Sequence, residues 1–253
     1  MRAALPATRV RWEIVIVLAL SLGASAVYSV ISLVAKLTEA GDLSSQTATL
    51  NPSVSPRPLL DLAYQLVGIS FALVPVVLVI YLLSAEQGSP TRRLGIDVST
   101  RRTASGDVGW GVGLAALIGI PGLGLYYLAR ALDLNATVVP SGLTDYWWTI
   151  PVLVLAAAQN AVLEEVVVVG YLITRLRQLG VGEWPTLAAS AVLRGSYHLY
   201  QGFGAFVGNV VMGLVFGYFY QRKGRVLPLI VAHTLIDIVA FVGYAVLRDA
   251  LHL

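Results

Sequence analysis

One stretch of the sequence decides the fold: residues 147–175, WWTIPVLVLAAAQNAVLEEVVVVGYLITR. A helix needs about 20 mainly apolar residues to cross a lipid bilayer, and this run exceeds that length. Trp147 and Trp148 stand at one end of it, as is typical of aromatic residues at a membrane interface. Two carboxyl groups, those of Glu164 and Glu165, nevertheless lie well inside the run. The stretch therefore predicts a membrane helix that carries ionisable groups at depth.

The whole chain has the composition of a membrane protein. Of its 253 residues, 57% are hydrophobic and only 12% are charged, and its mean hydropathy is +0.77. Soluble domains contain about 25% charged residues. The chain has no Cys, which excludes disulfides, thiolate zinc sites and a cysteine nucleophile. We expect an all-α, polytopic transmembrane helical bundle that forms a single integral membrane domain over residues 1–253.

Other apolar segments lie on both sides of the decisive stretch. With the decisive stretch included, there are seven apolar segments. The fourth, which is that stretch, is long enough to be split, and this would give eight membrane helices. The fifth and sixth are short, because about 16 residues reach only about 24 Å, less than the apolar core of about 30 Å. We therefore expect the hairpin between them, residues 200–204, to stop inside the protein. The segments are 12–36, 60–84, 108–130, 147–175, 184–199, 205–221 and 226–248.

The basic residues indicate the orientation, because cytoplasmic loops carry the excess of Lys and Arg. With the N-terminus inside, twelve basic residues fall in inside loops and four outside, and only Arg194 lies within a segment. This predicts a multi-pass cell-membrane protein with a cytoplasmic N-terminus, and the Ala-, Val- and Arg-rich composition hints at a bacterial plasma membrane. We attribute the net charge of +3 to the basic residues that set the membrane orientation, and we expect no nucleic-acid partner. The inside residues are Arg2, Arg9, Arg11, Arg92, Arg93, Arg101, Arg102, Arg175, Arg177, Arg222, Lys223 and Arg225, and the outside residues are Lys36, Arg57, Arg130 and Arg248.

The N-terminal segment allows a second interpretation. Basic residues, an apolar run and the sequence Ala24-Ser25-Ala26 resemble a signal peptide with its cleavage site. The apolar run continues to Val34, however, which is too long for the hydrophobic region of a typical signal peptide. We favour a retained first membrane helix.

Polar residues within the segments come in three pairs. The members of each pair are four residues apart and so share one helix face. Ionisable side chains are costly in a bilayer, usually face the interior of the bundle and mark function. Glu165 follows Glu164 directly, points about 100° away from it on a helix and needs a different partner. The pairs are Asn160 and Glu164, Arg194 and His198, and His233 and Asp237.

Arg194 should bring the pairs together. A buried guanidinium keeps its charge and needs an anion, for which Glu164, Glu165 and Asp237 are available. We therefore expect the fourth, fifth and seventh segments to touch. At a rise of about 1.5 Å per residue, Glu164, Arg194 and Asp237 all lie about 15–17 Å from the inner ends of their segments. Any one pair could be a hydrogen bond that only ties helices together, but three pairs at one depth favour a functional site.

The order of these motifs resembles a known family, the CAAX-protease and bacteriocin-processing (CPBP or Abi) intramembrane proteases. Members carry a Glu-Glu-x-x-x-Arg motif, then Phe-x-x-x-His, then His-x-x-x-Asn or His-x-x-x-Asp, on successive membrane helices. This sequence has Glu164-Glu165, then His198, then His233 and Asp237. The resemblance covers about residues 145–248, which it identifies as a catalytic helical core.

Two positions depart from the pattern of the family. Val169 stands where the motif arginine is expected, and Arg194 replaces the Phe of the second motif. Either the cation has moved from the fourth segment to the fifth, still beside the carboxylates, or activity has been lost. Because the four presumed catalytic residues all remain, we favour the moved cation.

The resemblance implies an intramembrane endopeptidase that cleaves a peptide or membrane-protein substrate. Glu164 would act as general base on a water molecule, assisted by His198. His233, oriented by Asp237, would donate a hydrogen bond to the developing oxyanion. No cofactor is implied. Two further residues would hold the geometry: Glu165 and Arg194.

Three alternatives stay open. Two His and two carboxylates could hold Zn²⁺ with an open position for water, although the sequence has no His-Glu-x-x-His motif. The same pocket could bind a partner in a non-catalytic scaffold or immunity protein, which the missing motif arginine favours. Buried Glu, Arg and His also build proton relays in transporters, but the sequence shows no inverted repeat.

Overall fold

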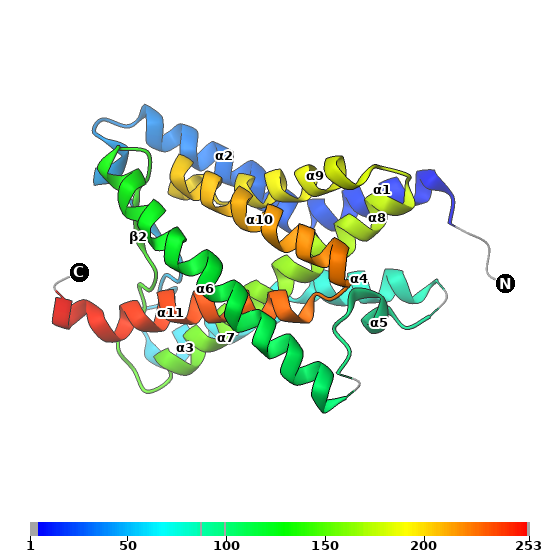
Figure 1. Ribbon diagram of the computed structural model, residues 1–253. Coiled ribbons are helices and arrows are strands. Elements are labelled where there is room, and N and C mark those ends of the chain that lie inside the picture. The colour runs from blue at the N-terminus through cyan, green and yellow to red at the C-terminus, as the bar shows by residue number, and fades with distance from the viewer. Residues whose placement is uncertain (1–4, 87, 99, 252–253) are drawn as a thin grey trace.

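The protein is a bundle of helices, seen here in a computed structural model that describes residues 5–86, 88–98 and 100–251 (Figure 1). The predicted all-α fold is confirmed, and the described residues contain one small sheet of two parallel strands. The longer helices are α1 (Ala7–Ala19), α2 (Leu22–Thr38), α3 (Pro58–Ala72), α4 (Val74–Ser84), α6 (Arg101–Ala131), α7 (Thr149–Glu164), α9 (Glu183–Ser196), α10 (Phe203–Lys223) and α11 (Leu227–Leu251). The shorter elements are η1 (Leu43–Ser45), β1 (Thr47–Thr49), α5 (Pro90–Leu94), β2 (Thr137–Val139), η2 (Glu165–Tyr171), α8 (Leu172–Gln178) and η3 (Leu199–Gln201).

Five helical spans in the described residues are long and apolar enough to cross a membrane. A sixth is obtained if α1 and α2, which meet at a bend of 50°, count as one span. Helix α9 has only 14 residues, a length of about 21 Å, which is too short for the apolar core. The predicted count of seven or eight membrane helices is therefore not confirmed. The five spans are Pro58–Ser84, Thr103–Ala131, Thr149–Gln178, Phe203–Lys223 and Leu227–Leu247.

The decisive stretch forms the central span, built from α7, η2 and α8 in direct succession. Of its most apolar window, 61% is buried inside the protein, against 33% or less for the other four spans. The middle piece, η2, is a π-helix that begins at Glu165. A π-helix closes its hydrogen bonds over one more residue than an α-helix, and such segments are frequent at functional sites. The backbone is therefore irregular at the point where the two carboxyl groups lie.

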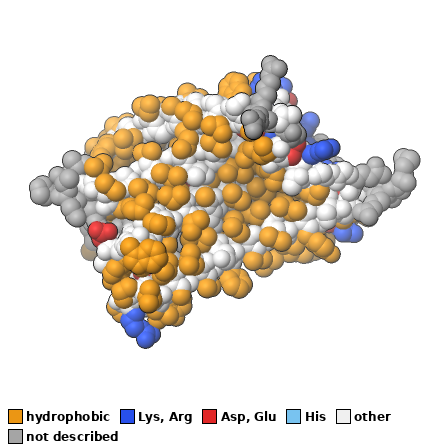
Figure 2. All heavy atoms as spheres, turned by 90° about the horizontal axis from the view of Figure 1, so that it is seen from below, with side chains coloured by type: hydrophobic (Ala, Val, Ile, Leu, Met, Phe, Trp, Pro, Cys, Tyr) orange, Lys and Arg blue, Asp and Glu red, His pale blue; other side chains and the backbone are white. Residues whose placement is uncertain are grey.

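The remaining helices surround this span. Helix α9 packs along α10 and contacts α2, while α11 packs between α6 and α7. The two termini lie at opposite ends of the molecule (Figure 1). Figure 2 shows hydrophobic side chains over most of the face seen from below, with Lys and Arg near its edges, as expected of a surface in contact with lipid. Arg2 lies outside the described residues, and only the backbone of Arg101, Arg102 and Arg248 is described.

The hairpin at residues 200–204 is only partly covered by protein, since Gly202 is buried but Phe203 is 41% exposed. The expectation of a short sixth segment is wrong, because α10 has 21 residues and is long enough to cross a membrane. The Tyr200 amide donates to Ser29 Oγ at 2.7 Å, and the Gln201 carbonyl accepts from the Ala136 amide at 2.8 Å. Gly202 has a φ of 122°, and a Cβ there would lie 2.6 Å from the Asn135 Cα. Only glycine fits this close approach. The hairpin thus holds the end of α9 against α2 and the loop before β2.

A second charged cluster, which the sequence did not reveal, closes one end of the bundle. Arg175 was counted as a loop residue, but its side chain is fully buried. Its guanidinium contacts Glu13 at 2.7 Å and also pairs with Glu86, which in turn binds Arg93. This cluster, the Arg175 network, joins α1, the end of α4, α5 and α8. It therefore anchors the central span where that span leaves the apolar core.

Replacing Arg175 tests this anchoring. The variant Arg175→Met leaves the Glu13 and Glu86 carboxylates without their shared partner, and we expect it to lower the free energy of unfolding by about 3 kcal/mol. This is the low end for a broken buried pair, because both carboxylates keep some contact with solvent. Thermal unfolding in detergent measures the change. Arg177→Met, at an exposed position of the same helix, is the control, and equal stability of the two variants would contradict the anchoring.

The same network predicts a dependence on pH. Burial of Glu86 opposes ionisation, but hydrogen bonds from Arg93 and Arg175 outweigh it, so the pKa of this carboxyl lies below its ordinary value of 4.5. A lowered folded-state pKa stabilises the fold above the unfolded value, and this contribution is lost as the pH falls through the folded value. The unfolding temperatures of wild type and Glu86→Gln should differ at pH 7 and converge as the pH falls from 4.5 through the lowered pKa of Glu86. A constant difference over this range would argue against the assignment.

Candidate active site

The polar residues predicted from the sequence converge from three parts of the chain. Glu164 ends α7 and Glu165 begins η2, while Arg194 lies in the last turn of α9. His233 and Asp237 follow one another on one face of α11. Their side chains make direct contacts across these elements, so the predicted meeting of the fourth, fifth and seventh segments is confirmed.

Arg194 lies at the centre of the cluster, with a side chain that is fully buried. Its Nη2 donates to Glu165 Oε1 at 2.5 Å, and its Nη1 lies 3.5 Å from Glu164 Oε2. The guanidinium also lies over the ring of Phe216, 5.7 Å from its centroid. A Cβ at Gly213 would come within 3.3 Å of Arg194 Cδ, so this glycine leaves the room that the long side chain needs. The buried cation therefore has the two anions expected for it.

His233 is held by Glu165 more closely than by Asp237. Its Nδ1 lies 2.7 Å from Glu165 Oε1, and because a carboxylate only accepts, the ring nitrogen is the donor. Its Nε2 lies 3.7 Å from Asp237 Oδ2, beyond a direct hydrogen bond. Asn160 provides Asp237 with a side-chain hydrogen bond. Glu165 is thus the shared anion of a histidine and an arginine, while Nε2 of His233 makes no direct hydrogen bond to Asp237.

Glu164 has a different environment from its neighbour. Its Oε2 accepts a hydrogen bond of 2.8 Å from the Tyr197 hydroxyl, a contact that the sequence did not predict. Its side chain keeps 11% of its surface exposed, whereas that of Glu165 is fully buried. A tyrosine near the end of an apolar helix is an ordinary interfacial residue, so nothing in the sequence pattern distinguished Tyr197.

His198 does not continue the helix that carries Arg194, and the predicted shared helix face is wrong here. Helix α9 ends at Ser196, and His198 lies in the turn before η3. Its Nδ1 nevertheless reaches the Arg194 carbonyl at 3.0 Å. Because a carbonyl only accepts, Nδ1 carries the proton, and a neutral ring then presents Nε2 as an acceptor. The half-buried ring lies beside that of Tyr197, with 4.8 Å between centroids.

The position of the missing motif arginine is occupied by apolar packing. Val169 is fully buried in the main hydrophobic cluster, together with Leu94 and Phe216. No charged side chain could be accommodated there without a partner. The positive charge reaches Glu165 from α9 instead, which is the geometry expected of a cation that has moved between segments.

A metal ion could use part of the same cluster. One ligand atom from each of Glu164, Glu165 and His233 lies within 4.8 Å of the other two, whereas His198 and Asp237 are not part of this group. A zinc site with three protein ligands is a known arrangement for activating water. The guanidinium of Arg194 already contacts both carboxylates, however, and a fixed positive charge there opposes a divalent cation. The three residues thus offer ligand atoms that zinc can bind, but both carboxylates are already ion-paired with Arg194.

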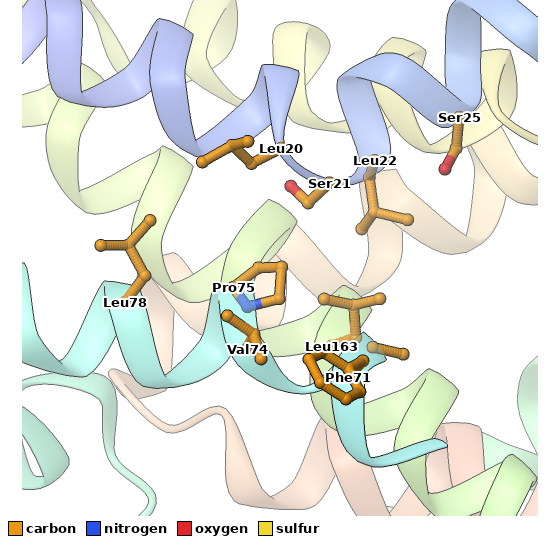
Figure 3. A pocket seen from close by; sticks show the side chains of 10 residues that line it. Leu20, Ser21, Leu22, Ser25, Phe71, Val74, Pro75, Leu78 and Leu163 are labelled. Atoms are coloured by element: carbon orange, nitrogen blue, oxygen red, sulfur yellow. The ribbon is translucent and has the colours of Figure 1, made fainter. Parts of the chain in front are cut away.

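An apolar crevice of about 420 Å³ lies between residues of α1 and α2 on one side and of α3 and α4 on the other (Figure 3). It opens where two helix breaks face one another, at Leu20–Leu22 between α1 and α2 and near Pro75 at the start of α4. Leu163, the residue before Glu164, forms part of its wall. None of the charged residues of the cluster lines it, so the crevice adjoins the site but is separate from it.

Removing the central cation tests the electrostatics of the site. We expect Arg194→Met to lower the free energy of unfolding by about 3–5 kcal/mol, because Glu165 would remain buried with an uncompensated charge. The double variant Arg194→Met with Glu165→Gln should recover part of this loss. Chemical or thermal unfolding in detergent measures both, with the exposed Arg222→Met as control. A double variant no more stable than Arg194→Met would show that the pair is not coupled.

Comparison with known proteins agrees with this geometry. Residues 146–239 match the family described as type II CAAX prenyl endopeptidase Rce1-like. No curated protein and no solved structure matches the chain significantly. The matched residues include all six predicted site residues and the central span. Residues 146–239 are therefore similar to the Rce1-like CAAX endopeptidase family, in agreement with the resemblance of the motifs that they carry.

Proposed function

We propose that this chain hydrolyses peptide bonds within the membrane and that Glu164 activates the attacking water without a metal ion. One observation carries the choice of base: of two adjacent carboxylates, Glu165 is sealed and ion-paired, while Glu164 keeps solvent contact. A general base must reach the proton it removes. Glu164 meets that condition and Glu165 does not.

In the first step, Glu164 takes a proton from a water molecule, and the water oxygen attacks the carbonyl carbon of the peptide. The carbonyl electron pair moves onto its oxygen and gives a tetrahedral oxyanion. His198 can hold the same water, because its Nδ1 proton is given to the Arg194 carbonyl and its Nε2 is free to accept. A positioned acid–base group contributes about 10²–10⁴-fold to the rate.

In the second step, the carbon–nitrogen bond breaks, and Glu164 returns its proton to the leaving nitrogen. The oxyanion needs a donor, and Nε2 of His233 provides one when the ring is protonated. At 3.7 Å from Asp237 Oδ2, this nitrogen makes no direct hydrogen bond to that carboxylate, so it remains able to donate to an oxyanion. Preorganised donors of this kind contribute most in a site from which water is largely excluded.

Glu165 and Arg194 serve this chemistry as supports. Glu165 accepts from His233 at 2.7 Å and from Arg194 at 2.5 Å through the same oxygen, Oε1. The histidine on α11 is thereby fixed relative to the base on α7. We propose that the substrate is a peptide or a membrane protein, because the site is built inside a bundle in the lipid bilayer and adjoins an apolar crevice. We also propose that the N-terminus is cytoplasmic, in keeping with the distribution of basic residues.

A zinc-dependent form of the same hydrolysis is the second candidate, since three ligand atoms lie within reach of one another. Zinc would supply a water of lowered pKa, and Glu164, Glu165 and His233 would hold it. Arg194 would then have to leave at least one of the two carboxylates. Elemental analysis of protein purified without a polyhistidine tag, together with activity after treatment with a chelator, separates the two forms. Loss of cleavage that returns only with added zinc would favour the metal.

Replacing the base tests the proposal directly. We expect Glu164→Gln to reduce cleavage of a peptide library, offered with and without prenyl groups, by about 10²-fold or more, because the amide cannot take the proton. The control is Glu183→Gln, at the first residue of α9 far along the helix from Arg194, which should cleave like wild type. Undiminished cleavage by Glu164→Gln would refute the assignment. A wild-type protein that cleaves nothing would favour a non-catalytic scaffold or immunity protein.

A further inference from the structure

The two oxygens of the Glu164 carboxylate differ in their contacts. Both contacts from the described residues fall on Oε2: the Tyr197 hydroxyl at 2.8 Å and Nη1 of Arg194 at 3.5 Å. No hydrogen bond from the described part of the chain reaches Oε1. Some side-chain atoms are fully buried and have no hydrogen-bond partner, such as Oε2 of Glu165, but Oε1 of Glu164 is not one of them. It therefore keeps accessible surface. One oxygen of the base is therefore anchored, and the other is open to water.

Tyr197 is built to be a fixed anchor. Only 5% of its surface is exposed, and its ring packs against Leu22 and Val168 in a small hydrophobic cluster of its own. Its backbone amide bonds to the Leu193 carbonyl, which holds the residue at the end of α9. A tyrosine has only two side-chain torsions, so packing of the ring fixes the hydroxyl closely. The hydroxyl is the donor, because an ionised carboxylate can only accept.

We infer that Tyr197 is a positioning residue, which holds Oε2 of Glu164 so that Oε1 alone faces the water and acts as the base. The inference rests on the proposed function and adds to it which oxygen reacts and what orients it. The hydrogen bond serves both halves of the cycle. When Oε1 takes a proton from water, Oε2 becomes the carbonyl oxygen of the acid and still accepts from Tyr197. The carboxyl group therefore keeps its orientation while the proton is returned to the leaving nitrogen.

Arg194 alone could not give this orientation. At 3.5 Å its Nη1 makes no hydrogen bond to Glu164, and the guanidinium is bound more tightly to Glu165. An ion pair of that length attracts the carboxylate without fixing its rotation. The short, directional hydrogen bond from the Tyr197 hydroxyl fixes the rotation of the carboxylate, which the guanidinium does not. The plainer interpretation, a core tyrosine whose hydroxyl merely finds a partner, makes a different prediction for kinetics.

Tyr197→Phe separates the two interpretations, because it keeps the buried ring and removes only the hydroxyl. We expect kcat to fall about 10–100-fold with KM changed less than about threefold, since a displaced base slows the chemical step but leaves substrate binding intact. Tyr220→Phe is the matched control: it loses a buried hydroxyl that bonds Thr174 at 3.0 Å, remote from the carboxylates. Both variants are measured on a peptide that the wild-type protein cleaves, with unfolding temperature recorded alongside.

The outcomes are distinct. A fall in kcat for Tyr197→Phe but not for Tyr220→Phe, at similar unfolding temperatures, supports the inference. Unchanged kcat for Tyr197→Phe, while Glu164→Gln is inactive, overturns the inference and leaves the proposed function standing. Full activity of both Tyr197→Phe and Glu164→Gln overturns the proposed function as well. If Tyr197→Phe fails to fold, Tyr197→His, which keeps a ring and a donor, must restore folding with measurable kcat, and its failure to do so counts against the inference.

Discussion

The buried charge of Arg194 is the constraint on which the rest of the site depends. A guanidinium cannot lose its proton, so an arginine with no solvent contact must have an anion beside it or the fold is lost. Glu165 and Glu164 supply that anion from the central span, and α10 leaves space through Gly213. Because Glu165 also holds His233, the same requirement fixes α11. One charge thus links three helical segments, the central span, α9 and α11.

This constraint also explains how the positive charge can occupy a different place in the sequence. The carboxylate of Glu165 needs a cation at a position in space, which can be reached from its own helix or from a neighbouring one. Val169 fills the place of the motif arginine with apolar packing, and Arg194 comes from α9 to the same carboxylate. The catalytic pattern in the sequence looks incomplete for this reason, while the side chains form a connected cluster. Residues 146–239 match the CAAX endopeptidase family although the cation comes from α9 and not from the motif position.

Much of the site could be predicted from the sequence, because charges in apolar segments are few and each must find a partner. That rule predicted a carboxylate partner for Arg194 among Glu164, Glu165 and Asp237, and the structure shows contacts to the two glutamates. The predictions that were wrong or missing depended on the local backbone conformation and on side-chain packing. A helix rule placed His198 beside Arg194, but α9 ends two residues earlier. The role of Arg175 was hidden because a basic residue near a segment end usually lies in a loop, and the hydroxyl of Tyr197 gives no signal in an apolar pattern.

The two charged clusters together hold the central span at two levels. The Arg175 network joins the C-terminal end of the central span, α8, to α1 and α5. Arg194 joins the middle of the span to α9. Between these levels runs η2, whose residues are all buried. A catalytic group performs best on a rigid element whose neighbours lock its orientation. Glu164, the proposed base, lies directly at the start of this doubly held region. The irregular π-helical backbone is tolerated at this depth because its residues are all buried in protein. The ion pairs that fix the helices therefore also protect the backbone beside the proposed base.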